Sequence, residues 1–184
     1  MSFSTIRSHV VPLLVDHIDT DQIIPARYLK TVDQDGLGQH LFADWRKNGD
    51  FVIDKPEHKG AQVLLSGTNF GCGSSREHAA WALMGAGFRA VIAPSFGDIF
   101  RANALRNGLL PVKLSPKECS SVADAPATTI EIDLADQCVQ VDDATYRFEI
   151  DAFAKECLLQ GIDPLEYVLK HLDDIQHHER KYYG

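Results

Sequence analysis

The fold of this chain is decided by one stretch, Gly67-Thr68-Asn69-Phe70-Gly71-Cys72-Gly73-Ser74-Ser75-Arg76-Glu77-His78-Ala79-Ala80. An apolar run at 63–65 precedes it, and a helix-favouring run at 79–84 follows it. This order predicts a strand, a glycine-rich loop and a helix. Glycines at 67, 71 and 73 permit positive φ angles and close backbone approach. Ser74 or Ser75 is expected to cap the helix.

A loop of this kind is typical of an anion site. It points several backbone N–H groups at one place, where the helix N-terminus adds partial positive charge and Arg76 adds a planar fork of donors. The pattern does not distinguish a phosphate from a carboxylate, and it matches neither the P-loop nor the dinucleotide fingerprint. A structural role stays equally open, in which the serines only cap the helix and Arg76 pairs with Glu77 or another surface acid.

Length and composition predict a single domain over residues 1–184 with its own core, since 45% of residues are hydrophobic and 24% are charged. The net charge of -8 argues against a protein that binds nucleic acid or an anionic membrane in general. We find no apolar N-terminal segment and no run of about 18 apolar residues, so neither a signal peptide nor a membrane span is expected. The four cysteines are widely spaced, which favours a reducing, cytoplasmic location and no metal or cofactor bound by this chain.

Strands and helices are expected to alternate in the middle of the chain, which predicts an α/β fold with parallel strand pairs. Strands are expected at 10–15, 63–65, 89–94 and 109–114, and possible strand character at 51–53. Helices are expected at 39–45 and from a Ser95 cap to Asn107, where Gly108 ends the second one. Residues 26–38 are expected to form a mobile polar loop.

The last third of the chain predicts a different arrangement. Short alternating segments at 129–134, 138–141 and 146–150 indicate an antiparallel meander. Helices are expected at 152–160 and 163–172, followed by a polar tail from about residue 173 that frays.

Three acids lie between residues 16 and 21, and their spacing does not fit an EF-hand. They form either a solvated turn or a group in which at least one acid orients a cation or a catalytic side chain. Arg27 and Lys30 follow and could reach a bound anion, or they could be ordinary surface charges.

The segment from Asn69 to Ala79 closely resembles the signature of the swivelling β/β/α domain of the aconitase superfamily. The remainder resembles the small subunits of bacterial 3-isopropylmalate dehydratases over nearly the whole chain. The motifs that carry this resemblance are Asp19-Thr20-Asp21-x-Ile23-Ile24-Pro25, His40-Leu41-Phe42-x-Asp44-Trp45-Arg46, Ala93-Pro94-Ser95-Phe96-x-Asp98-Ile99-Phe100 and Leu109-Leu110-Pro111-Val112-Lys113-Leu114.

The resemblance implies a hydro-lyase of leucine biosynthesis that interconverts 2-isopropylmalate and 3-isopropylmalate through 2-isopropylmaleate. It implies a heterodimer in which the partner, a large subunit, carries a 4Fe-4S cluster. It also implies a mixed sheet with C-terminal helices.

By the same resemblance, Ser74 is the catalytic base, acting as an alkoxide, and Asp21 is the active-site aspartate that holds polar groups in position. Ser75 and Arg76 would bind a substrate carboxylate. Arg27 and Lys30 lie where aconitase supplies a second arginine, without a clean match. Cys72 would line the pocket, and His78 would be structural.

Two other functions stay open. Lys30 is similar to a cation in homoaconitase-type loops, so a homoaconitase-type or methyl-substituted malate hydratase is an alternative. A non-catalytic anion-binding regulatory module is the alternative of another class.

Overall fold

The computed structural model describes residues 3, 5–29, 36–47, 49–125 and 129–183. The strands form two four-stranded sheets. The parallel sheet has the order β2-β3-β4-β5, and the antiparallel sheet has the order β1-β6-β7-β8. The strand bounds are β1 Thr5–Ser8, β2 Val10–Leu13, β3 Val63–Ser66, β4 Ala90–Ala93, β5 Leu110–Lys113, β6 Ile130–Asp133, β7 Cys138–Val141 and β8 Ala144–Arg147.

Helices follow the parallel strands along the chain, and three more helices form its C-terminal part. The α-helices are α1 Thr20–Ile23, α2 Ala43–Arg46, α3 His78–Gly85, α4 Asp98–Asn107, α5 Pro116–Asp124, α6 Ala152–Gln160, α7 Pro164–Lys170 and α8 Leu172–Tyr183. Short 3₁₀ helices are η1 Ala26–Tyr28, η2 Leu37–His40, η3 Val52–Asp54 and η4 Pro56–His58.

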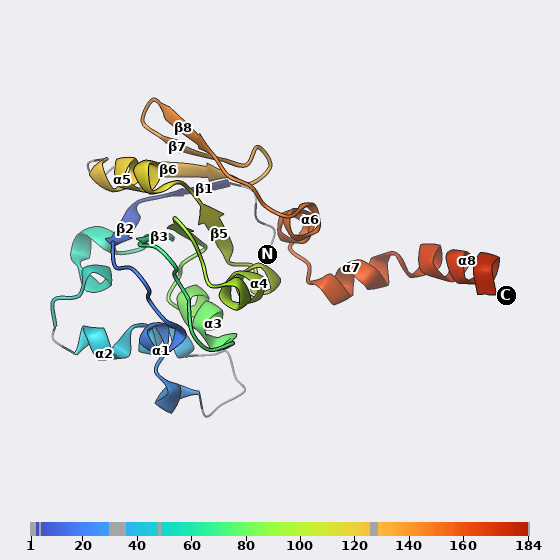
Figure 1. Cartoon of the computed structure of the whole chain (residues 1–184), viewed down its shortest axis with the longest axis horizontal. Coiled ribbons are helices and arrows are strands. Elements are labelled where there is room, and N and C mark those ends of the chain that lie inside the picture. The colour runs from blue at the N-terminus through green and yellow to red at the C-terminus, as the bar shows by residue number, and fades with distance from the viewer. Residues whose placement is uncertain (1–2, 4, 30–35, 48, 126–128, 184) are drawn as a thin grey trace.

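The layers follow from the alternation of side chains along the buried parallel strands. Leu64 and Val91 lie in one hydrophobic cluster with residues of α3 and α4, whereas Val63 and Ile92 lie in a second cluster with Ile132 and other residues of the antiparallel sheet. The parallel sheet is therefore the middle layer, with helices on one face and the antiparallel sheet on the other (Figure 1). This is the β/β/α arrangement expected from the resemblance, with the parallel and antiparallel pairings divided between two sheets.

Several local predictions were wrong, because tertiary contacts override local preference. Residues 51–53 do not form a strand, since the 3₁₀ helix η3 lies there. The helix expected at 39–45 is split by Phe42, whose φ is 50°. The strand expected at 146–150 is β8 instead, and it begins at Ala144.

Helix α4 begins at Asp98 after Gly97 and has no side-chain cap, because the Ser95 hydroxyl accepts from Asn69 N instead (2.9 Å). The tail from residue 173 lies in helix α8 rather than in a frayed segment.

The carboxyl ends of parallel strands meet at one edge of the sheet. The segments after β2, β3 and β4 therefore lie side by side there, and they include the glycine-rich loop and the acids at 16–21. The sheet thus brings together two stretches that the sequence keeps about fifty residues apart.

Candidate active site

The glycine-rich loop joins β3 to α3, as the sequence predicted. Gly71 and Gly73 have φ angles of 73° and 89°, in the left-handed region that favours glycine. A Cβ at Gly71 would lie 2.7 Å from Cβ and Cδ1 of Phe100, which is buried. Gly71 is therefore required for space as well as for backbone conformation.

Backbone hydrogen bonds hold the loop from both sides. On one side, His17 N donates to Thr68 O (2.7 Å) and Gly71 N donates to Ile18 O (2.7 Å). On the other side, Phe70 N donates to Ser95 O (3.0 Å), and Gly97 N donates to Phe70 O (2.9 Å). The loop is thus fixed between the chain segments that follow β2 and β4.

Helix α1 is a single turn that packs against the loop. Asp19 caps it, since its Oδ1 accepts from Gln22 N while Asp19 N donates to Gln22 Oε1 (2.8 Å each). Thr20 N donates to Cys72 O (3.0 Å), and the buried Thr20 hydroxyl donates to Ser74 O (3.1 Å). Thr20 therefore fixes the backbone of Ser74.

An ion pair joins α1 to the loop, because Arg76 Nη1 donates to Asp21 Oδ1. The Arg76 side chain is 25% exposed and the Asp21 side chain is 53% exposed, so the pair lies at the mouth of the site. The acid that pairs with Arg76 comes from a segment 55 residues away, and it is not the neighbouring Glu77. Glu77 instead accepts from Asn107 Nδ2 (2.7 Å).

The two serines are exposed, and neither caps α3. The N-cap position is Glu77, and its side chain makes no capping hydrogen bond. The turn at Gly73 leaves both serines before this position, so neither is the N-cap residue. Within the described chain, the Ser74 and Ser75 hydroxyls form no hydrogen bond to another protein group. The prediction that a serine caps this helix was wrong, and the hydroxyls face solvent at the loop tip.

Arg27 lies on η1 and is engaged elsewhere. Its Nη1 and Nη2 donate to both oxygens of Asp44 (2.8 and 2.7 Å), and its guanidinium lies 4.6 Å from the Tyr28 ring centroid. The hydrogen bonds from Arg27, with a further one from Lys47, hold the pKa of the Asp44 carboxyl well below its ordinary value. The other cation predicted for this site, Lys30, lies outside the described residues.

Cys72 and His78 flank the loop. Cys72 is partly buried, and its Sγ donates to His17 O (3.5 Å). The His78 ring packs 4.7 Å from the Trp81 ring on the first turn of α3. Within the described ranges, we find no group of three His, Cys, Asp or Glu side chains that could hold a metal ion. No described helix combines the length and apolarity needed to span a bilayer.

Sequence reasoning missed the role of Thr20. Nothing in its local pattern marks it, because a threonine among acids also suits a solvated turn. Its role depends on β2 and β3 being neighbours, which brings Thr20 within hydrogen-bond distance of the serine loop.

Comparison with known proteins identifies the family. Residues 1–117 match the family model of the aconitase C-terminal domain. The 3-isopropylmalate dehydratase small subunit of Herpetosiphon aurantiacus is 49% identical over 180 residues, which covers 96% of this chain and 92% of that protein. The chain belongs to the 3-isopropylmalate dehydratase small-subunit family.

Other members of this family are similarly close. The small subunit of Roseiflexus castenholzii is 51% identical, and the match covers 96% of this chain and 92% of that protein. The crystal structure of 3-isopropylmalate dehydratase (leuD) from Methanocaldococcus jannaschii is 33% identical, with a TM-score of 0.73. It covers 95% of this chain and 99% of that chain, so the family likeness extends to the fold.

Proposed function

We propose that the chain is the small subunit of a 3-isopropylmalate dehydratase, a hydro-lyase of leucine biosynthesis. The enzyme would interconvert 2-isopropylmalate and 3-isopropylmalate through 2-isopropylmaleate, and it would be active only with its large subunit. The observation that carries this proposal is the Asp21–Arg76 pair beside two exposed serines, in a chain that is 49% identical to a known small subunit over 92% of that protein. The pair supplies a positioned cation for a carboxylate substrate.

Ser74 is proposed as the base that removes the carbon-bound proton. A serine hydroxyl is too weak an acid to ionise alone near neutral pH, so its surroundings must stabilise the negative oxygen. Arg76 is two residues away along the loop, and Thr20 fixes the backbone of Ser74. Exposure of Ser74 supports this role, because the base has to reach a substrate that arrives from solvent.

Arg76 is proposed to bind a substrate carboxylate together with Ser75. The Asp21 carboxylate takes one guanidinium nitrogen, Nη1, and within the described chain the other two nitrogens have no protein partner. The remaining donors are therefore available for a bidentate bond to a carboxylate. Asp21 would act as a positioning residue that sets the angle of this fork.

Arg27 and Lys30 are proposed as secondary contacts to the substrate. Arg27 would have to exchange its two hydrogen bonds with Asp44 for bonds to the ligand. Charge-assisted bonds to the ligand would replace those lost to Asp44, while Lys47 would remain bonded to the Asp44 carboxylate.

The described residues do not fit an iron–sulfur cluster, because Cys119, Cys138 and Cys157 are buried and no ligand group is assembled. We propose that a 4Fe-4S cluster is carried by the large subunit, where it would act as the Lewis acid for the departing hydroxyl. We propose further that the chain binds neither nucleic acid nor membrane and works in the cytoplasm. Its net charge of -8 and its four free cysteines support both statements.

The test of the proposal is a Ser74→Ala substitution in the complex reconstituted with the large subunit. Removing a general base is expected to lower kcat by about 10²–10⁴-fold with little change in KM. Ser120→Ala is the matched control, since Ser120 is an exposed serine on α5 whose hydroxyl bonds only Pro116 O among the described residues. Normal turnover of 2-isopropylmalate by the Ser74→Ala complex would show that this serine is not the base.

A second pair of variants tests the positioning role of Asp21. Asp21→Asn is expected to lower kcat/KM about 10–100-fold, because the guanidinium loses its anionic partner and its fixed angle. Asp54→Asn is the control, since Asp54 pairs with Arg46 at similar exposure but away from the loop. Equal effects of the two substitutions would refute a specific role for Asp21.

A further inference from the structure

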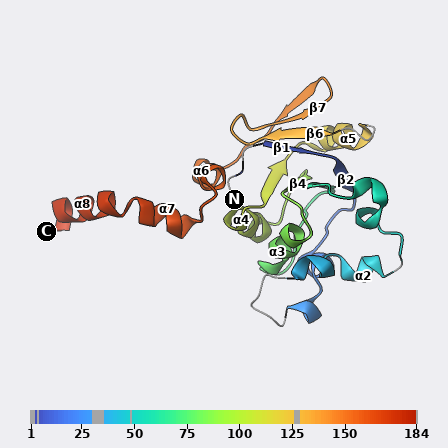
Figure 2. The same cartoon turned by 180° about the vertical axis from the view of Figure 1, so that it is seen from behind.

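Helices α7 and α8 form a C-terminal arm that extends away from the body in both views (Figures 1 and 2). The arm is rooted through α6, in which Cys157 and Leu158 are buried. Between α6 and α7 the chain turns at Gly161, which has a φ of 68° and ends α6. Asp163 and Glu166 then form a capping box that starts α7. The direction of the arm is thus set by specific caps.

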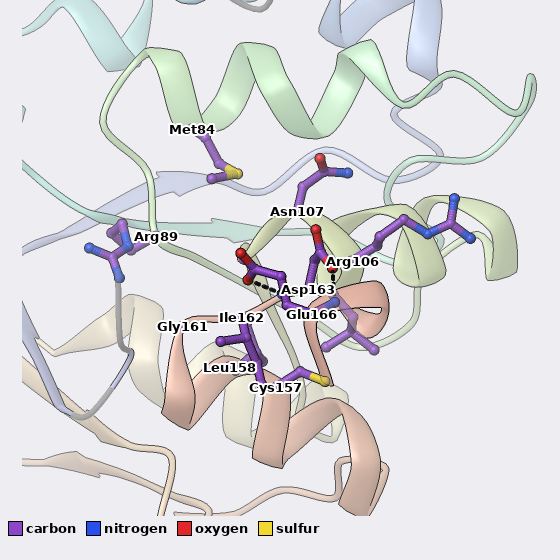
Figure 3. A pocket seen from close by; sticks show the side chains of 12 residues that line it. Met84, Arg89, Arg106, Asn107, Cys157, Leu158, Gly161, Ile162, Asp163 and Glu166 are labelled. Carbon is purple, nitrogen blue, oxygen red and sulfur yellow. Dashed lines mark hydrogen bonds between the residues drawn. The ribbon is translucent and has the colours of Figure 1, made fainter. Parts of the chain in front are cut away.

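One side of α7 faces the body. The Tyr167 ring packs edge-on against Phe153 of α6 at 4.9 Å, and Lys170 Nζ donates to Gln160 Oε1 (3.2 Å). Glu166 lines a cleft of about 510 Å³ that lies between the end of α6 with its following turn and the carboxyl ends of α3 and α4 (Figure 3). The body-facing side of α7 is therefore polar or aromatic. The aliphatic residues of α7 take no part in these contacts.

The apolar residues of the arm, aliphatic except for Tyr182, point outward. Within α7, residues 165, 168 and 169 are three and four apart, and within α8, residues 172, 175 and 182 are three and seven apart, which places each group along one face of its own helix. We define this set as the outer row, and its members with their exposed fractions are Leu165 65%, Val168 46%, Leu169 57%, Leu172 43%, Ile175 37% and Tyr182 61%.

The arrangement of α7 is the reverse of an ordinary surface helix, whose apolar face packs on its own domain. A helix of 12 residues such as α8 is marginal in water without tertiary packing. Helix α7 turns Tyr167 and Lys170 toward the body, and α8 lies beyond it with its apolar residues exposed, so the arm is built for a partner outside the chain.

The comparisons with known small subunits favour the large subunit as the partner that binds the arm. The aconitase C-terminal model ends at residue 117, well before the arm. The small subunit of Cytophaga hutchinsonii matches 97% of this chain, which leaves out too few residues to exclude the arm. The arm is thus shared with small subunits that are separate polypeptides. A separate subunit has no covalent tether to the chain that carries the rest of the active site, so it needs an additional contact to stay bound.

We propose that the outer row of the arm is a docking surface for the large subunit, which receives it in an apolar groove. This inference rests on the proposed function, since it assumes that a large subunit completes the site. The serine loop then delivers the reacting groups, while the arm holds the two chains together at a distance from the chemistry. Substrate can enter beside the loop without separating the subunits.

The test compares two double variants of the full-length chain. Leu169→Glu with Leu172→Glu places two charges in the outer row, whereas His177→Glu with Lys181→Glu places two on the opposite face of α8. The row variant is expected to bind the large subunit about 100-fold more weakly by calorimetry, since two buried leucines are lost. The control variant should bind within about threefold of the unchanged chain, and circular dichroism should show both variants folded.

Turnover separates this inference from the proposed function. At saturating large subunit, the row variant should recover the unchanged kcat, whereas Ser74→Ala should not. A row variant that binds the large subunit as tightly as the unchanged chain would overturn the inference. It would also be overturned if light scattering found a dimer of the isolated chain that the row variant dissolves, with large-subunit affinity unchanged. The outer row would then join two copies of this chain.

Discussion

Substitution of Gly71 by alanine should destabilise the protein far more than the same change two residues later. At Gly71 the new Cβ would lie 2.7 Å from both Cβ and Cδ1 of Phe100, a side chain that is 2% exposed and packed in the core under the loop. At Gly73 the new Cβ would meet only Asp19 Cβ at 3.5 Å and Thr20 Oγ1 at 3.8 Å, both ordinary contacts. Both positions have positive φ, so the pair of variants isolates the steric effect.

The expected magnitudes follow from these distances. A left-handed alanine costs about 1–2 kcal/mol at either position. Overlap with the Phe100 ring adds about 1–3 kcal/mol at Gly71 alone, because the ring has no free space to move into. Gly71→Ala should therefore lower the free energy of unfolding by about 2–5 kcal/mol, and Tm should fall by about 10 °C in a chain of this length.

The assay is urea and thermal unfolding of the two variants beside the unchanged chain. Gly73→Ala should lose about 1–2 kcal/mol with a similar m-value. If the two variants lose equal stability, the reasoning that close contact with Phe100 requires glycine at position 71 is refuted. A loop raised by the Gly71 variant should also displace the serines, so the reconstituted complex should lose activity in proportion.

Two further predictions concern the thiols and the start of α5. A thiol-alkylating reagent should label Cys72 in the native chain and the other three cysteines only after unfolding, because those three are buried. Burial also raises the pKa of the Cys119 thiol to about 11, which keeps this thiol protonated and unreactive. Mass spectrometry that finds a buried cysteine labelled before Cys72 would contradict this prediction. Hydrogen bonds from the Ser115 hydroxyl and then its backbone N–H lower the pKa of Glu118 below the ordinary 4.5. Because the folded pKa is depressed, the contribution of the Glu118 charge is complete above pH 4.5 and declines as the pH falls through the folded value. Glu118→Gln should therefore be less stable than the unchanged chain at pH 7, with a gap that closes below pH 4.5; a gap that is independent of pH would count against this account.

Local chemistry accounts for the elements that the sequence predicted correctly. The apolar run at 63–65 can be satisfied only in a buried strand, and Gly71 and Gly73 need the positive φ angles that a tight loop provides. Gly108 ends α4 with a φ of 90° for the same reason. These features depend on neighbouring residues, so they can be predicted from the chain alone.

Capping residues show where local reasoning fails. A serine before a helix can cap it or can bond a distant backbone group, and the sequence does not tell which partner is near. Ser95 accepts from Asn69 N because β3 and β4 are adjacent, so α4 starts without it. At Ser115, no such competitor is present among the described residues, and a capping box forms with Glu118.

By itself, the sequence determined the strand, loop and helix around the serines, the α/β order of the middle of the chain and the family. The tertiary structure decided that Asp21 holds Arg76, that Thr20 holds the backbone of Ser74 and that the apolar row of the arm points away from the body. The physical reason is range: backbone preference acts over a few residues, whereas the Asp21–Arg76 ion pair and the Thr20–Ser74 hydrogen bond depend on which distant segments the parallel sheet brings together.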